Sequence, residues 1–135
     1  MRALTVSAHG GVEQLQVVTD LPLPALGSPT DVRVRIHAVA LNHLDLFALR
    51  GLPGMPVQAK WVVCADGAGT VDSVGAAVEG LAAGDRVMIN PGISDRTCAF
   101  CTAGEQSLCE HFQLLGEHLP GTAAEYVVLP RPIFA

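Results

Sequence analysis

The chain is poor in aromatic and basic residues, and this narrows what it can bind. Of its 135 residues, one is Trp, one is Tyr and four are Phe, so stacking on nucleic-acid bases is not expected as a main activity. Lys60 is the single lysine, and the formal net charge is −5. Such a surface suits neither nucleic acid nor an anionic membrane. Both are therefore excluded as expected partners.

Long apolar runs are also missing. No stretch approaches the roughly 20 residues of a transmembrane helix, and residues 1–6 lack the apolar block and cleavage site of a signal peptide. The sequence therefore predicts a cytoplasmic protein, in which cysteines bind metals more often than they form disulfides. A chain of 135 residues, half of them apolar, is long enough for one domain with a real core.

Glycine, proline and valine are plentiful and favour short strands joined by tight turns. The clearest strand covers residues 31–37, where apolar and polar side chains alternate strictly. Asn42 then begins a helix as its N-cap, Asp45 lies in the first turn, and Gly51 ends the helix. This pattern predicts a mainly β fold, a small, partly open barrel with one short helix. Six further strands are expected at residues 2–7, 14–18, 61–65, 69–74, 86–89 and 122–129.

Three of the four cysteines fall within one loop. Cys98 and Cys101 form a CxxC turn, Cys109 closes the set, and Asp95 stands three residues before the first cysteine. Such a turn can direct two thiolates at one ion about 2.3 Å away, and four ligands complete a closed structural zinc site. The spacing therefore predicts zinc. The fourth cysteine, Cys64, stands alone and is interpreted as a small buried hydrophobe.

The glycines after Asp66 resemble the start of a dinucleotide-binding GxGxxG motif. However, Asp72 occupies the place of the third glycine, and no amphipathic helix follows. We interpret Gly67 and Gly69 as residues at a crowded strand bend. No strand–GxGxxG–helix unit is found between residues 1 and 135, so no dinucleotide-binding fold is expected within them.

Five motifs, in order, resemble the GroES-like N-terminal domain of the medium-chain dehydrogenase/reductase superfamily. The resemblance runs from Arg2 to about Pro130 and extends to a zinc-lobed branch of alcohol dehydrogenases and quinone reductases. It implies one GroES-like domain over residues 1–135, with a zinc lobe at about 90–111. The motifs are Asn42-His43-Leu44-Asp45, Asp66-Gly67-Ala68-Gly69, Gly84-Asp85-Arg86-Val87, the cysteine loop and Ala124-Glu125-Tyr126-Val127-Val128.

In the family, the structural zinc is held by four cysteines. Here Cys98, Cys101 and Cys109 fill the last three positions, and Asp95 stands at the first. A carboxylate oxygen is an acceptable zinc ligand, so the resemblance implies a zinc site with one harder donor. His111, two residues after Cys109, is the alternative fourth ligand, although its closeness to Cys109 makes the geometry harder.

The family's alcohol dehydrogenases also carry a catalytic zinc. The resemblance places its cysteine ligand at Asn42, its histidine ligand at Ala65 and the adjoining glutamate at Asp66, so no catalytic zinc is expected. An Asn at position 42 is similar to the zinc-independent quinone-reductase branch, in which a side-chain amide can stabilise an enolate oxygen. Asn42 and Asp45 are thus the catalytic candidates, although Asn42 could simply cap its helix. His43 is the cofactor-binding candidate or merely exposed.

The resemblance implies the substrate domain of an NAD(P)-dependent oxidoreductase, most similar to a quinone or enone reductase. Its substrate would be a small carbonyl compound or enone, and the chain would be inactive without the nucleotide-binding half that holds NAD(P)H. The alternatives are a zinc-dependent alcohol dehydrogenase domain and a non-catalytic GroES-like binding module. Apolar surface left by the missing half is expected to favour self-association.

Overall fold

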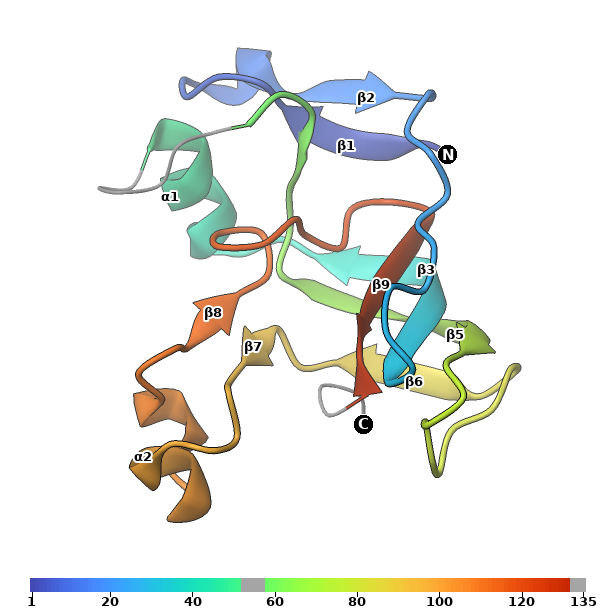
Figure 1. Cartoon of the computed structure of the whole chain (residues 1–135). Coiled ribbons are helices and arrows are strands. Elements are labelled where there is room, and N and C mark those ends of the chain that lie inside the picture. The colour runs from blue at the N-terminus through green and yellow to red at the C-terminus, as the bar shows by residue number, and fades with distance from the viewer. Residues whose placement is uncertain (52–57, 132–135) are drawn as a thin grey trace.

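The computed structural model describes residues 1–51 and 58–131. Its three-stranded sheet contains the first strands of the chain and has the strand order β2-β1-β4. The strands are β1 (Ala3–Val6), β2 (Gln16–Val18) and β4 (Trp61–Val62), and both partners run antiparallel to β1. In Figure 1 this sheet lies at one end of the molecule, beside helix α1.

The larger sheet is built around the strand that the sequence predicted most clearly. That strand, β3 (Asp31–Ala40), pairs antiparallel with β5 (Asp66–Val74) on one side and with β9 (Tyr126–Pro130) on the other. The fourth strand, β6 (Arg86–Ile89), pairs with β5, and the order is β6-β5-β3-β9. Figure 1 shows an open, strongly twisted sheet. The predicted mainly β, partly open architecture is confirmed.

Alternation along β3 explains why the main core lies on one face of this sheet. Val32 and Val34 are fully buried, whereas Arg35, the next residue on β3, is exposed. Successive side chains of a strand point to opposite faces, so this alternation is expected. Burial of each such valine stabilises the fold by roughly 1.5–3 kcal/mol. The core cluster consists of Val32, Val34, Val71, Val87, Ile89, Leu115, Val127 and Leu129.

Helix α1 (His43–Arg50) begins and ends where the sequence predicted. Asn42 is its N-cap and forms a capping box with Asp45. Gly51 adopts a left-handed φ of 101° and donates its N–H to the carbonyl of Phe47 at 3.0 Å, which ends the helix. Within residues 1–51 and 58–131, no helix is long and apolar enough to cross a membrane.

Several strands differ in extent from the prediction. The strand expected at 61–65 stops at Val62, because Cys64 adopts a left-handed φ of 71° and cannot continue the ladder. The strand expected at 122–129 is displaced to β9, because Thr122 instead donates its N–H to the carbonyl of Cys64. Between β1 and β2, the connection contains the 3₁₀ helix η1 (Val12–Gln14) rather than a simple tight turn.

Gly69 supports the interpretation of its motif as a crowded strand. A Cβ added there would lie 2.0 Å from the backbone oxygen of Arg35 on the neighbouring strand. The register between β3 and β5 also shifts next to this position, between Ile36 and Ala38. The glycine is therefore needed for close strand packing at an irregular point of the sheet, and no helix follows it.

The cysteine loop projects from the sheets on a short two-stranded stem that the sequence did not predict. The stem pairs β7 (Gly92–Ile93) with β8 (Gln113–Leu114) in antiparallel register. At its tip lie the single-turn helix α2 (Ala99–Thr102) and the 3₁₀ helix η2 (Gln106–Leu108). Figure 1 shows this lobe extending away from β3 and β9. We refer to residues 92–114 as the lobe.

Candidate metal centre and the pocket beside helix α1

The lobe brings the four predicted metal ligands together. The ligand atoms of Asp95, Cys98, Cys101 and Cys109 all lie within 4.8 Å of one another. In a tetrahedron with bonds of about 2.3 Å, neighbouring sulfurs stand roughly 3.8 Å apart. Only a small inward movement therefore separates this arrangement from a zinc shell. Three soft sulfur donors also suit zinc better than magnesium or calcium, so the donor set fits the ion.

Backbone groups of the lobe orient the cysteines. Cys98 is the N-cap residue of α2, and Cys109 follows η2 directly. The sulfur of Cys109 accepts hydrogen bonds from the backbone N–H groups of Asp95 at 3.3 Å and His111 at 3.4 Å. These two contacts fix the position of the Cys109 sulfur at the base of the cluster.

Asp95 is held in place on both sides of its carboxylate. Its Oδ1 accepts hydrogen bonds from the backbone N–H groups of Thr97 at 2.8 Å and Cys98 at 3.0 Å. Its Oδ2 lies 2.7 Å from Nδ1 of His111. The Cys98 N–H, and then His111, hold the pKa of Asp95 well below its usual range. His111 is exposed and is not among the converging groups, so it orients Asp95 from outside the cluster.

The thiols of Cys98 and Cys101 differ in acidity. The backbone N–H of Cys101 holds the pKa of Cys98 below its usual value. Burial, assisted by the neighbouring Cys98, raises the pKa of Cys101 to about 11. Zinc binds both residues as thiolates, so an ion entering this site would displace the proton of Cys101.

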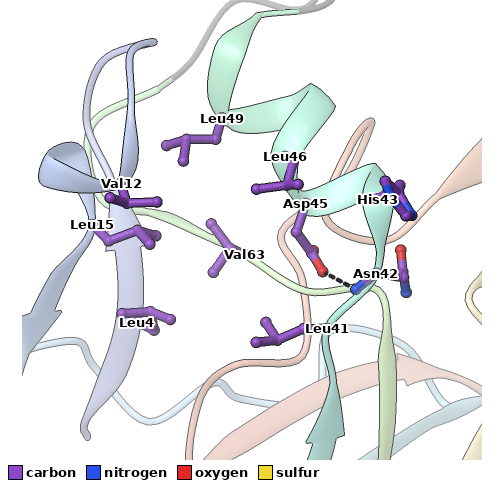
Figure 2. Close-up of a pocket in the computed structure, with 10 residues that line it drawn as sticks. All are labelled: Leu4, Val12, Leu15, Leu41, Asn42, His43, Asp45, Leu46, Leu49 and Val63. Atoms are coloured by element: carbon purple, nitrogen blue, oxygen red, sulfur yellow. Dashed lines mark hydrogen bonds between the residues drawn. The ribbon is translucent and has the colours of Figure 1, made fainter.

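A second candidate site lies beside helix α1 and is mostly aliphatic. It is a pocket of about 440 Å³ between α1 and the β1–η1 region. Figure 2 shows its aliphatic side chains facing one another, with Asn42, His43 and Asp45 at the start of the helix. The aliphatic lining consists of Leu4, Val12, Leu15, Leu41, Leu46, Leu49 and Val63.

The polar groups at the start of α1 are bonded mainly to each other and to the backbone. Asn42 Oδ1 accepts the N–H of Leu44 at 3.3 Å, and the backbone N–H of Asn42 donates to Asp45 Oδ2 at 2.8 Å (Figure 2). Asn42 Nδ2 donates to Asp66 Oδ2 at 3.1 Å. The structure therefore brings Asn42 and Asp45 together and shows that Asn42 caps the helix. His43 is exposed, with its ring 6.4 Å from that of Phe47.

The resemblance assigns two further positions of the family's catalytic zinc site to Ala65 and Asp66. Ala65 is buried and has no donor atom, while Asp66 receives the Asn42 amide. Among the residues that the structure describes, the only converging group of three or more His, Cys, Asp or Glu side chains is the one at 95–109. No metal-ligand set is therefore formed at Asn42.

Sequence reasoning missed the position of Cys64 beside this site. Burial, together with the smaller effect of the charges of Asp45 and Asp66, raises the pKa of its thiol to about 11. Its left-handed φ of 71° is uncommon for a residue with a side chain. The only signal in the sequence was its place directly before Ala65 and Asp66.

Comparison with known proteins identifies the family. Residues 28–134 match the alcohol dehydrogenase GroES-like domain. The chain belongs to this family. The wider medium-chain dehydrogenase/reductase superfamily, to which the matching enzymes belong, was the one predicted.

Similar proteins include oxidoreductases that are longer than this chain. L-idonate 5-dehydrogenase of Vitis vinifera is 36% identical over 89% of this chain and 33% of its own length. Probable D-xylulose reductase A of Aspergillus fumigatus is 35% identical over 90% of this chain and 34% of its own. A solved NAD-dependent alcohol dehydrogenase is 52% identical, with a TM-score of 0.92, over 100% of this chain and 39% of its own.

The length and the names of these relatives bear on the predicted function. The chain spans about a third of the length of the curated relatives it matches. The relatives support an oxidoreductase domain, but they do not support the preferred quinone-reductase interpretation. Their names favour the alternative, an alcohol dehydrogenase domain.

Proposed function

We propose that this chain is the substrate domain of an NAD(P)-dependent dehydrogenase that interconverts small alcohols and their carbonyl compounds. The observation that supports the proposal is likeness over the whole chain to an NAD-dependent alcohol dehydrogenase, at 52% identity and a TM-score of 0.92. The nucleotide-binding half would be supplied by a region corresponding to the remainder of the relatives. When bound, the nicotinamide would accept or supply the hydride.

The lobe would have a structural role in this enzyme. We propose that one zinc ion is held by Asp95, Cys98, Cys101 and Cys109, whose ligand atoms already lie within 4.8 Å of one another. The lobe has only short two-residue strands in its stem, so a metal would supply cohesion that apolar packing does not. A closed shell of four protein ligands leaves no position for substrate, so this ion would not take part in the chemistry.

Asn42 and Asp45 are proposed to face the substrate, and His43 the cofactor. The Asp45 carboxylate lines a mostly aliphatic pocket, where it could accept a proton from an alcohol or pass one to solvent. The Asn42 amide could donate a hydrogen bond to a substrate oxygen through the N–H that is not directed at Asp66. The aliphatic lining favours an apolar substrate group over a polyol.

A second candidate, reduction of an enone or quinone, is favoured by one observation. Asn42 and Ala65 occupy the positions where the family's alcohol dehydrogenases hold catalytic zinc, and no ligand set converges there within the described residues. Without a Lewis acid, ionisation of an unactivated alcohol is harder. A neutral amide suits an enolate-like oxygen better.

Steady-state kinetics on a fusion to a nucleotide-binding half of a relative would test both candidates. The isolated chain should show no NAD(P)H oxidation above a boiled control, since it has no GxGxxG unit. In the fusion, a kcat/KM for a primary aliphatic alcohol above that for an enone supports the proposal. The reverse order, without added metal, would replace it with the second candidate.

Two substitutions separate chemistry from helix capping. Asn42→Ala removes both the cap and the amide, whereas Asn42→Ser keeps a capping oxygen and removes only the amide. If the amide touches the substrate oxygen in the transition state, both variants should lower kcat/KM to a similar extent. Normal kinetics for Asn42→Ser would assign Asn42 to capping alone.

A further inference from the structure

Two exposed arginines lie on either side of one threonine on the outer face of the larger sheet. Thr70 on β5 is directly opposite Arg35 on β3 and Arg86 on β6. Residues directly opposite one another in a sheet project from the same face. The adjacent Val71 and Val87 are buried in the core, so the three polar side chains project to the other side. Two strand spacings separate the arginines, roughly 10 Å between Cα atoms.

In the part of the chain that the structure describes, the two arginines form no ion pair, although the protein has excess acidic charge. The sequence has 13 acidic and 8 basic residues, so there are more carboxylates than Lys and Arg side chains to pair with them. Asp72, the nearest acidic residue along β5, instead pairs with Arg33 at 2.7 Å. Within residues 1–51 and 58–131, the side chains of Arg35 and Arg86 have neither a carboxylate within 4.0 Å nor a hydrogen-bond partner.

His37 and a hollow in the sheet surface lie next to Thr70 and Arg86. The ring of His37 places Nε2 3.0 Å from the Thr70 hydroxyl oxygen. Beside it is a hollow of about 430 Å³ on the sheet face. Its floor is low because Ala38, Ala68 and Gly69 carry little or no side chain. The complete lining is His37, Ala38, Ala68, Gly69, Arg86, Val87 and Met88.

We propose that Arg35, His37, Thr70 and Arg86, the β3–β6 cluster, bind a phosphate dianion. Each guanidinium can donate two parallel hydrogen bonds to phosphate oxygens, and the Thr70 hydroxyl can donate one more. A dianion between the arginines would neutralise two like charges that otherwise repel each other. The site is separate from both the lobe and the α1 pocket, and it does not depend on the proposed enzyme activity.

The phosphate could be free or carried by a phosphomonoester, and binding measurements distinguish these sources. Backbone amide chemical shifts of the 135-residue protein would be followed while inorganic phosphate, or separately glycerol 3-phosphate, is added at constant ionic strength. Sodium acetate serves as the monoanion control. We expect saturable shifts at Thr70 and Arg86 with one or both phosphates and none with acetate. Tighter binding of the monoester would identify an ester ligand.

Matched variants decide whether the cluster is the site. Arg35→Gln/Arg86→Gln should weaken phosphate binding at least roughly tenfold, since hydrogen bonds to charged groups are strong. Arg50→Gln changes an exposed arginine at the end of α1 and should leave binding unchanged. If the double variant fails to fold, Arg86→Gln alone is titrated, with a smaller loss expected. No saturable shift, unchanged binding in the arginine variants, or an equal loss in Arg50→Gln would overturn the proposal.

Discussion

The lobe and the start of helix α1 each bring polar side chains together, but the side chains differ in type and in what they face. In the lobe, Asp95 and three cysteines direct their ligand atoms at one point. At α1, Asn42 and Asp45 direct theirs at each other, at the helix backbone and at Asp66, and Ala65 offers nothing. Polar composition alone therefore does not make a metal site. Soft donors must be present and must converge.

The largest expected effect comes from breaking the cluster in the lobe. Cys101→Ala removes a buried sulfur, and three ligands cannot close a structural zinc shell. Bound zinc should fall from about one equivalent to nearly none, with loss of order in the lobe. Metal analysis and amide hydrogen exchange would measure both. Cys64→Ala is the control, because Cys64 lies outside the cluster. Zinc-free protein with an ordered lobe would contradict the prediction.

The start of α1 should become a metal site if the missing sulfur and imidazole donors are supplied there. Asn42→Cys/Ala65→His places a sulfur and an imidazole beside Asp66, which already lies 3.1 Å from the Asn42 amide. We expect zinc content to rise from about one to about two equivalents. Ala65→His alone should bind no second ion, since two protein ligands are too few. If the double variant stays at one equivalent, the geometry at α1 rather than its composition prevents binding.

A smaller effect is expected from the residue that orients Asp95. His111→Ala removes the 2.7 Å contact to the carboxylate and leaves the four proposed ligands in place. Zinc affinity should fall by roughly 10–100-fold, as for other groups that orient ligands. Competition with a chromophoric chelator would measure it. His43→Ala, which alters an exposed histidine on α1, should have no effect. Complete loss of zinc would instead make His111 a ligand.

The smallest effect should follow from removal of the helix cap. Asn42→Ala leaves the N–H of Leu44 without its 3.3 Å acceptor and should lower the free energy of unfolding by about 1 kcal/mol. Urea denaturation would measure the change, and Asn42→Ser should stay within a few tenths of a kcal/mol of the original protein. Equal stability of Asn42→Ala would show that the capping contact contributes little.

Elements with a strong local signal could be predicted from sequence. Strict alternation indicated β3, and the Asn42–Asp45 capping pair with Gly51 marked both ends of α1. The stem strands β7 and β8 were missed because two residues are too few to show a period. The α1 pocket was missed for another reason. Its lining comes from β1, η1 and α1, which meet only after folding.

The sequence alone determined the fold class, the family and which four side chains make up the candidate metal cluster, because each depends on spacing along the chain. The tertiary structure decided what distant residues do to one another. Cys64 has its left-handed φ of 71° in a segment where Thr122 and Ala123 donate their N–H groups to the carbonyls of Cys64 and Val63. Similarly, His111 became the partner of Asp95 through folding of the lobe. Such contacts join residues far apart in the chain, so no local pattern encodes them.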